Sequence, residues 1–332
     1  MSADKTSIDV SVVSPIYNEI ENVEMLARKL HEALSAMHRS YEIILVDDGS
    51  SDGSWEKMVE LSKAIPNLRI IRLRRNFGQT AAMSAGFDAA RGEFIVTLDA
   101  DLQNDPSDIP KLIARAEQGF DVVSGWRKDR KDKFLSRRLP SMIANSLISK
   151  ITGVALHDYG CTLKVYHRDV IKHLRLYGEM HRFIPAWLAT VTTPRRISQE
   201  PTTHHARTAG VSKYGISRTF RVILDLIAVY FFMRFRARPG HFFGGIGLGL
   251  TALSGLVLAW LAWVKFGLGN PIGGRPALIV GIGGLIAGVH FITTGVLAEL
   301  LARIYFESGT IRSYSARPER LLAADEGWHV PT

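Results

Sequence analysis

Residues 94–106 read FIVTLDADLQNDP, and this stretch decides how the first part of the chain folds. The run FIVT and the leucine after it are apolar or β-branched, which is typical of a buried strand. The strand pattern then ends in Asp99 and Asp101, which flank one small residue. A buried strand with such a dense acidic end indicates that the end of the strand has a chemical use.

The first two hundred residues alternate between strand and helix patterns. Strand patterns occupy residues 7–15, 41–50, 68–75 and 93–101. Helix patterns occupy residues 19–37, 54–65 and 78–90. This repeating β-α-β order predicts an α/β fold with a mainly parallel sheet and helices on both faces. Ligands of such sheets bind at the carboxyl ends of the strands, where residues 15–19, 47–50 and 99–101 carry polar groups.

Composition narrows the class of partner. The chain of 332 residues has a net charge of +9 and a pI near 9.7, which favours an anionic partner such as nucleic acid, acidic lipid or a phosphorylated substrate. The single cysteine, Cys161, excludes an internal disulfide and any multi-cysteine metal site. The first residues lack an apolar core of signal-peptide length, so we expect the first domain to stay unexported.

Two uncharged runs near the end of the chain predict a membrane hairpin. Residues 242–264 and 276–298 contain no Asp, Glu, Lys or Arg, and each run is about as long as the roughly 20 residues that cross a bilayer. The Gly- and Pro-containing linker between them predicts a tight turn. Arginines flank the outer ends of the hairpin, so the positive-inside rule predicts that the N-terminal domain and the tail are cytoplasmic. Two buried helices of a soluble core are disfavoured because the runs are too long and too free of charge.

These patterns divide the chain into four predicted parts. They are a cytoplasmic α/β domain at 1–215, an interfacial amphipathic helix at 216–238, two transmembrane helices within 239–303 and a cytoplasmic tail at 304–332. Inside the spans, the pairs Gly245 and Gly249, and Gly284 and Gly288, have the small-xxx-small spacing that permits close helix packing in lipid. Such packing would serve either the hairpin itself or a homo-oligomer.

The acidic strand end suits a divalent metal ion. Hard cations take oxygen ligands and leave positions for substrate phosphates, and Gln103 adds a neutral oxygen to the carboxylates of Asp99 and Asp101. Capping of the next helix is the alternative. It explains residues 104–107, which include good capping residues, but leaves Asp99 and Asp101 unexplained. Mg²⁺ or Mn²⁺ is therefore the expected cofactor.

Several motifs together resemble one enzyme family. SPIYNE, VDDGSSDGS, NFGQTAAMSAG, DADLQNDP, DYGCTLKVY and VSKY, followed by a two-span hairpin, are similar to the polyisoprenyl-phosphate glycosyltransferases of family 2, which have the GT-A fold. The resemblance covers residues 8 to about 318. The DxD motif alone is a weak signal, whereas the ordered set with its hairpin is specific.

The resemblance implies a nucleotide-sugar site at the first strand ends. It implies that Pro15, Tyr17, Glu19 and Asp48 hold the base and ribose. A carboxylate only accepts hydrogen bonds, so Asp48 suits a uracil N–H. The remaining positions, by the same resemblance, are Gln79 and Asp99 for the donor, Asp101 and Gln103 for the metal, and Arg207 and Lys213 for the diphosphate. A helix N-terminal role for Gln79 is an equal alternative.

A basic segment implies the acceptor site. Residues 127–138 carry seven basic and two acidic side chains, and a helix pattern with an apolar face follows. Taken alone, the run is as consistent with a solvated surface as with a function. The resemblance places lipid-phosphate ligands at Arg127, Arg137 and Ser141, and a guanidinium binds phosphate bidentately.

The mechanism implied is direct displacement. A lipid phosphate monoester is largely dianionic at neutral pH, so it needs no general base to attack the anomeric carbon, and in-line attack predicts inversion. The resemblance also places a carboxylate at Asp158, which is expected to accept from a sugar hydroxyl or to orient another group. The implied partners are a nucleotide sugar, a polyisoprenyl phosphate and the membrane, and no nucleic acid.

Two other classes of function compete with this interpretation. A processive polysaccharide synthase would carry a Gln-x-x-Arg-Trp motif and more spans, and this chain has no Arg-Trp pair. An inactive membrane scaffold would be expected to have lost Asp101, Gln103 or Arg137, and all three are present. The favoured prediction is metal-dependent, inverting transfer at the inner membrane, from a UDP-sugar such as UDP-glucose to undecaprenyl phosphate, for cell-envelope glycan or lipopolysaccharide modification.

Overall fold

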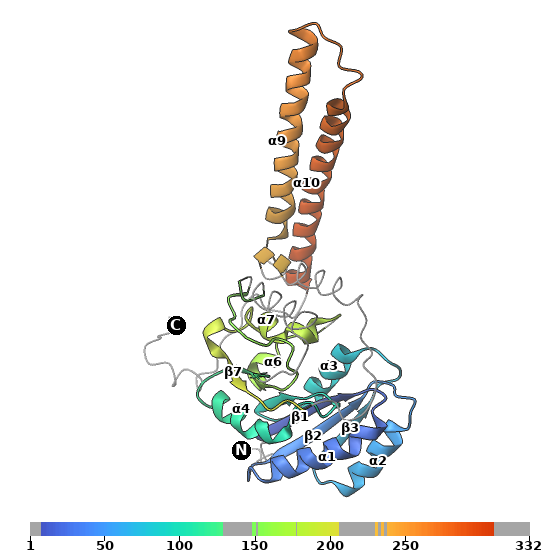
Figure 1. Cartoon of the computed structure of the whole chain (residues 1–332), viewed down its shortest axis with the longest axis vertical. Helices are drawn as coiled ribbons and strands as arrows, with labels where there is room; N and C mark the ends of the chain where they lie inside the picture. Colours follow the sequence, from blue (N-terminus) through green and yellow to red (C-terminus); the bar gives the residue numbers. More distant parts are fainter. Residues whose placement is uncertain are drawn as a thin grey trace. The chain divides into compact units, whose positions relative to one another are not determined.

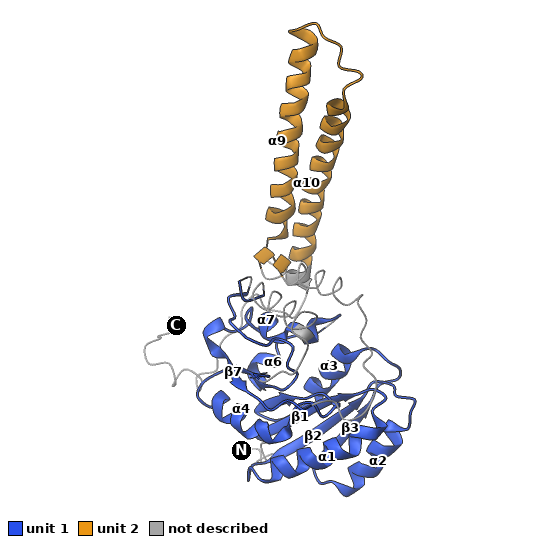
Figure 2. Cartoon of the chain, in the orientation of Figure 1, with its two compact units in different colours: residues 1–226, 315–332 blue, residues 227–314 orange. Residues whose placement is uncertain are grey.

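The computed structural model describes residues 8–128, 148–150, 152–176, 178–205, 230–231, 234–235 and 238–308. The chain divides into two compact units, one formed by residues 1–226 and 315–332 and the other by residues 227–314 (Figure 2). Most of the predicted interfacial helix, and the tail from residue 309, lie outside the described residues.

Within the described residues, seven strands form one sheet in the order β3-β2-β1-β4-β6-β5-β7 (Figure 1). Their bounds are β1 Val10–Ile16, β2 Tyr41–Asp47, β3 Leu68–Arg72, β4 Phe94–Thr97, β5 Val122–Trp126, β6 Lys164–His167 and β7 Ile197–Pro201. All adjacent pairs are parallel except those of β6, which runs antiparallel to both β4 and β5. The predicted α/β fold with a mainly parallel sheet is confirmed, while the reversed strand was not predicted.

Helices cover both faces of the sheet, as predicted (Figure 1). The α-helices of the first unit whose bounds are described are α1 Ile20–Ser35, α2 Ser54–Ala64, α3 Gln79–Ala89, α4 Ile109–Ala116, α6 Arg168–Ile171 and α7 Ile184–Leu188. The apolar side chains of α1, α2 and α4 share one buried core with Val10 and Val12 of β1. Helix α3 packs on the opposite face, where an added Cβ at Gly86 would overlap Val13, so glycine is needed for this close approach.

The sequence explains this layering through two periodicities. In α1 the buried residues are spaced by three or four positions, so one stripe of the helix faces the sheet: Asn22, Val23, Leu26, Ala27, Leu30 and Leu34. In β1, alternate side chains point to opposite faces, which places Val12 in the α1 core and Val13 against α3. The same alternation at the start of β6 places Val165, and Leu163 just before the strand, in that core.

The second unit contains the two apolar helices α9 Pro239–Phe266 and α10 Pro276–Ser308 (Figure 2). Both are long and apolar enough to cross a membrane, and they contain the predicted spans 242–264 and 276–298. Their contact is made by small residues: an added Cβ at Gly247 would lie 2.7 Å from the Gly288 carbonyl oxygen, and one at Gly284 would overlap Ser254. Beyond the adjacent residues and the backbone of α9, no atom of the described residues lies within 4 Å of an added Cβ at Gly245 or Gly249. The second predicted glycine pair therefore serves the hairpin, and the first faces away from it.

Glu299 is an acidic residue close to the end of the apolar part of α10. Its Oε2 accepts a hydrogen bond from the backbone N–H of Gly240, at a distance of 3.2 Å. Gly240 lies in the first turn of α9, where backbone N–H groups lack partners within the helix and the helix dipole favours negative charge. Glu299 therefore caps α9 and joins the two helices at that end of the hairpin.

Candidate active site

The predicted polar strand ends lie together at one edge of the sheet, which we call the carboxyl edge: the ends of β1, β2 and β4 with the loops that follow them. Register brings them together, because Ile16 pairs with Asp47 and Val13 pairs with Thr97. The reversed direction of β6 adds a fourth segment, residues 158–163, because this segment precedes β6. Thr97 pairs with Lys164 in that strand.

Hydrogen bonds from short polar side chains connect the loops after β1 and β2. The backbone N–H of Asn18 donates to Ser50 Oγ at 3.0 Å, and the N–H of Ser51 donates to Asn18 Oδ1 at 2.9 Å. Asn18 has a φ of 53°, a left-handed conformation that is costly for most residues other than glycine. Of the predicted donor ligands here, Tyr17 is exposed, and the Glu19 carboxylate accepts from Asn22 Nδ2 at 2.7 Å.

Asp48 holds the loop between β3 and α3. Its two carboxylate oxygens accept the backbone N–H groups of Phe77 at 2.7 Å and Gly78 at 2.9 Å. Burial raises the pKa of this carboxyl, and the two backbone hydrogen bonds oppose that effect. Each oxygen has a further lone pair, so the predicted contact with a uracil N–H stays a prediction. The neighbouring Asp47 accepts from the N–H of Ser50 at 3.0 Å and so supports its own turn.

Asp99 and Gln79 form a direct pair at the end of β4. Gln79 Nε2 donates to Asp99 Oδ1 at 2.8 Å, which joins the first residue of α3 to the acidic strand end. Burial, followed by the like charge of Asp101, raises the pKa of Asp99 to about 6. Perturbed carboxyl groups of this kind are concentrated at functional sites.

The DxD turn is held in an unusual backbone conformation. Leu102, between the predicted metal ligands, has a φ of 58°, and the Gln103 N–H donates to Asp101 Oδ1 at 3.2 Å. Left-handed residues other than glycine cost free energy and are often retained at functional sites. The two predicted metal ligands, residues 101 and 103, therefore lie on one short loop.

The donor set of this turn fits a divalent cation held jointly with a substrate. Among the residues that the structure describes, no group of three or more His, Cys, Asp or Glu side chains could hold a metal by itself. Magnesium sites that use substrate phosphates need only one or two carboxylates from the protein. Asp101, with a second acid at Asp99 and an amide at Gln103, meets that requirement.

Arg127 and Asp158, predicted as an acceptor ligand and a site carboxylate, form a bidentate ion pair. Arg127 Nε lies 2.6 Å from Asp158 Oδ2, and Nη2 lies 2.9 Å from Oδ1. Both side chains are largely buried, with 13% and 4% exposed. Asp158 also accepts the Gly160 N–H at 3.0 Å. The carboxylate thus fixes the plane of the guanidinium, while both predicted roles of Asp158 toward the substrates stay predictions.

The chain that follows β7 runs along the DxD loop. The N–H of His205 donates to the Gln103 carbonyl at 2.8 Å, and Asn104 and His204 form an antiparallel bridge. The ring of His205 contacts Asp105 Oδ2 at 2.9 Å. These contacts bring residue 205 to the predicted metal loop, two positions before Arg207. Arg207 itself, with Lys213, Arg137 and Ser141, lies outside the described residues, and the roles given to these four residues stay predictions.

Sequence reasoning missed one buried charge at this edge. Lys164 is 3% exposed, and its ammonium donates to the backbone carbonyls of Tyr159 and Cys161. It lines a small cavity of about 20 Å³ together with Asp99, Gln79 and His181. The available signal was a lysine between apolar residues in LKVY, a pattern that otherwise reads as a buried strand.

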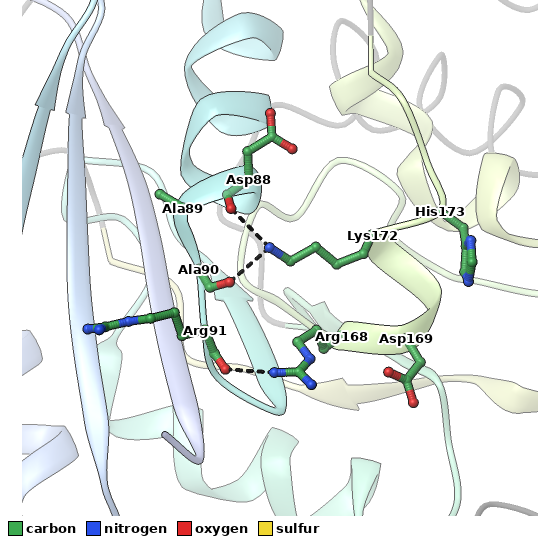
Figure 3. Close-up of a pocket in the computed structure, with 8 residues that line it drawn as sticks. All are labelled: Asp88, Ala89, Ala90, Arg91, Arg168, Asp169, Lys172 and His173. Atoms are coloured by element: carbon green, nitrogen blue, oxygen red, sulfur yellow. Dashed lines mark hydrogen bonds between the residues drawn. The ribbon is translucent and has the colours of Figure 1, made fainter. Parts of the chain in front are cut away.

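A larger cavity, of about 460 Å³, lies at the opposite edge of the sheet, where β1, β2 and β4 begin (Figure 3). Lys172 in this cavity donates to the carbonyls of Asp88 and Ala90, and Arg168 donates to that of Arg91. These side chains satisfy carbonyls at the end of α3 and in the loop after it. Among the residues that the structure describes, the lining of this cavity includes no predicted site residue.

Comparison with known proteins shows the family of this chain. Residues 11–175 match the family described as Glycosyl transferase family 2. The chain is 53% identical over 316 residues to the dodecaprenyl-phosphate galacturonate synthase of Rhizobium johnstonii, covering 94% of this chain and 93% of the relative. It is 36% identical over 327 residues to the undecaprenyl-phosphate 4-deoxy-4-formamido-L-arabinose transferase of Pseudomonas fluorescens, covering 95% and 94%.

Solved structures support the fold. The glucosyl-3-phosphoglycerate synthase of Mycobacterium tuberculosis, in complex with Mn²⁺, UDP and glucosyl-3-phosphoglycerate, matches with a TM-score of 0.53 and 16% identity. That match covers 69% of this chain and 81% of the other. The chain therefore belongs to glycosyltransferase family 2, in the group of polyisoprenyl-phosphate sugar transferases that its motifs resemble. It is a glycosyltransferase with a GT-A fold.

Proposed function

We propose that this enzyme transfers a sugar from a nucleotide sugar to the phosphate of a polyisoprenyl lipid. The observation that carries the proposal is the 53% identity to a dodecaprenyl-phosphate galacturonate synthase, which extends over 94% of the chain and so includes the apolar hairpin. The carboxyl edge supports it, since acidic and amide side chains follow the ends of three strands there and the Arg127–Asp158 ion pair lies near Asp99.

The donor is proposed to be a UDP-sugar, with a UDP-uronate such as UDP-galacturonate as the first candidate. The relative named for galacturonate is 53% identical, whereas the relatives named for formamidoarabinose are 36–39% identical. UDP-glucose, the example given with the predicted UDP-sugar, belongs in the same donor panel. The acceptor is proposed to be undecaprenyl phosphate or a close homologue in chain length.

In the proposed reaction, an oxygen of the lipid phosphate attacks the anomeric carbon of the sugar. The bond from that carbon to the diphosphate breaks, and the nucleoside diphosphate leaves with the electron pair. The acceptor is already largely dianionic at neutral pH, so no side chain has to remove a proton. In-line displacement inverts the configuration at the anomeric carbon.

The side chains of the carboxyl edge would position the two substrates and compensate charge. Asp101 and Gln103 would hold Mg²⁺ or Mn²⁺, which when bound neutralises charge on the diphosphate. Gln79 holds Asp99 toward the donor. Arg127, fixed in its plane by Asp158, would bind the acceptor phosphate.

The hairpin is proposed to insert α9 and α10 into the inner membrane, with the catalytic domain on the cytoplasmic side. The arginines that flank the outer ends of the predicted spans favour this orientation. Insertion would bring the enzyme to the membrane that contains its lipid acceptor.

The test is a product assay on full-length enzyme in detergent. Undecaprenyl phosphate, Mn²⁺ and a panel of UDP- and GDP-sugars that includes UDP-galacturonate and UDP-glucose are incubated with the enzyme, and lipids are analysed by mass spectrometry. A lipid heavier by one sugar residue is expected from one donor. If the enzyme binds nucleotide but forms no such lipid with any donor of the panel, the proposal is contradicted.

A further inference from the structure

Lys164 is buried at the start of β6, and the proposed reaction gives this lysine no role. Its side chain lies on the face of the sheet covered by α3, since Leu163 and Val165 on either side of it belong to the opposite core. A buried ammonium is costly unless it is hydrogen-bonded, and lysines are rarely so fully buried. We therefore expect the ammonium of Lys164 to have a specific role at this position.

The ammonium holds one turn. Lys164 Nζ donates to the carbonyl of Tyr159 at 3.2 Å and to the carbonyl of Cys161. These two carbonyls flank Gly160, so the ammonium closes the turn formed by residues 158–161. The turn begins with Asp158, whose Oδ1 accepts the Gly160 N–H at 3.0 Å.

The same turn packs closely against the side chain of Arg127. An added Cβ at Gly160 would lie 3.1 Å from Arg127 Nη2, which is tighter than ordinary van der Waals contact. The guanidinium therefore lies against the turn and is held there by both oxygens of Asp158. Of the five N–H donors of a guanidinium, Asp158 uses two, and this fixes the direction of the others.

Acidic side chains lie near the buried ammonium of Lys164. Burial lowers the pKa of the ammonium, and the nearby acids Asp158 and Asp99 act in the opposite direction. Lys164 and Arg127 therefore lie near these two acids at the carboxyl edge, where Asp101 is a third acid beside Asp99. Replacing the ammonium with an apolar group would leave the carbonyls of Tyr159 and Cys161 without this donor.

We propose that Lys164 is a positioning residue for the lipid-phosphate acceptor. It acts through the turn 158–161 and Asp158, which together set the orientation of the Arg127 guanidinium. The inference rests on the proposed role of Arg127 as an acceptor ligand. It predicts that loss of Lys164 impairs use of the lipid more than use of the nucleotide sugar.

Lys172 offers a matched control in the same chain. Its ammonium also donates to two backbone carbonyls, those of Asp88 at 3.1 Å and Ala90 at 2.9 Å, and burial also lowers its pKa (Figure 3). It lies at the opposite edge of the sheet, and the two residues whose carbonyls it binds are not predicted site residues. Lys172→Met therefore measures the general cost of removing a lysine that holds two carbonyls.

The experiment compares KM values for acceptor and donor in full-length wild type, Lys164→Met, Lys164→Arg and Lys172→Met. Lys164→Met is expected to raise the KM for undecaprenyl phosphate about tenfold to a hundredfold, the range for losing hydrogen bonds to a charged group, with the donor KM little changed. Lys164→Arg keeps the charge and several donors, so it should recover part of the loss. Lys172→Met should leave both KM values unchanged.

An equal rise of both KM values, or an unchanged acceptor KM in folded Lys164→Met, would overturn the inference. If Lys164→Met does not fold, Lys164→Gln replaces it with the same expected difference between acceptor and donor. Absence of lipid product from the wild type would instead contradict the proposed function, so the two failures are distinguishable.

Discussion

At the two edges of the central sheet, the pKa values of buried acids are shifted in opposite directions. At the carboxyl edge, Asp99 lies near Asp101, and burial with this like charge raises its pKa to about 6. At the opposite edge, where the strands begin, Glu42 is buried but receives hydrogen bonds from Ser11, Arg69 and Arg91. Burial acts to raise the pKa of Glu42, and these hydrogen bonds outweigh it and lower the pKa.

This difference indicates that buried acids at one edge stabilise the fold and that buried acids at the other edge serve the proposed reaction. Charges that are fully compensated by the protein hold segments together, as Glu42 does for the starts of β1, β2 and β4. Like charges left side by side destabilise the free protein and are retained where a ligand compensates them. The left-handed Asn18 and Leu102 also lie at the carboxyl edge. Substitutions at the two edges should therefore fail in different ways.

The largest effect is expected for Asp101→Ala at the carboxyl edge. Removal of the proposed metal ligand should lower transfer by about a thousandfold, as loss of a key electrostatic group does in other enzymes. It should also abolish the response to added Mn²⁺ or Mg²⁺, measured by titrating metal in the product assay. Turnover that still rises with metal would show that Asp101 is not a metal ligand.

Next in size is Asp158→Asn, which keeps the shape of the side chain but removes its charge. The Arg127 guanidinium would lose its bidentate partner, so acceptor use should fall about tenfold to a hundredfold. The measurement is the KM for undecaprenyl phosphate at saturating donor. An unchanged KM together with a lower unfolding temperature would mean that the ion pair has only a structural role.

Glu42→Gln at the opposite edge should change stability and spare catalysis. The loss of charge-assisted hydrogen bonds is expected to lower the free energy of unfolding by about 1–3 kcal/mol. Denaturant unfolding of the purified protein measures the change, and the product assay run below the unfolding transition serves as the control. A fall in kcat at full folding would break the proposed separation between the edges.

The smallest effect concerns pH. Because the pKa of Glu42 lies below its ordinary value of 4.5 in the folded protein, its contribution to stability is present above that value. The contribution is lost as the pH falls through the lowered pKa, since the unfolded chain then binds a proton more readily. Unfolding midpoints measured from neutral pH into this acidic range should fall less steeply for Glu42→Gln than for wild type. Equal slopes would contradict this assignment.

The sequence predicted those parts of the molecule that depend on local pattern. Periodicity located β1, β2, β3, β4 and α1, and the length of two uncharged runs located the hairpin. The carboxyl-end rule placed Asp99, Asp101 and Asp48 at one edge. The reversed β6 escaped prediction because a short apolar run carries no signal of direction. The pairing of Arg127 with Asp158 and the burial of Lys164 follow from that reversal. Contacts between residues 31 positions apart depend on topology and not on local pattern.

The most direct test of the carboxyl edge as the active site is a side-by-side product assay on wild type, Glu42→Gln and Asp101→Ala. Each protein is incubated with undecaprenyl phosphate, the identified UDP-sugar and Mn²⁺, and sugar-bearing lipid is measured by mass spectrometry. If the carboxyl edge performs the transfer, wild type and Glu42→Gln form the product at similar rates and Asp101→Ala forms almost none. Product from Asp101→Ala at the wild-type rate would contradict that assignment.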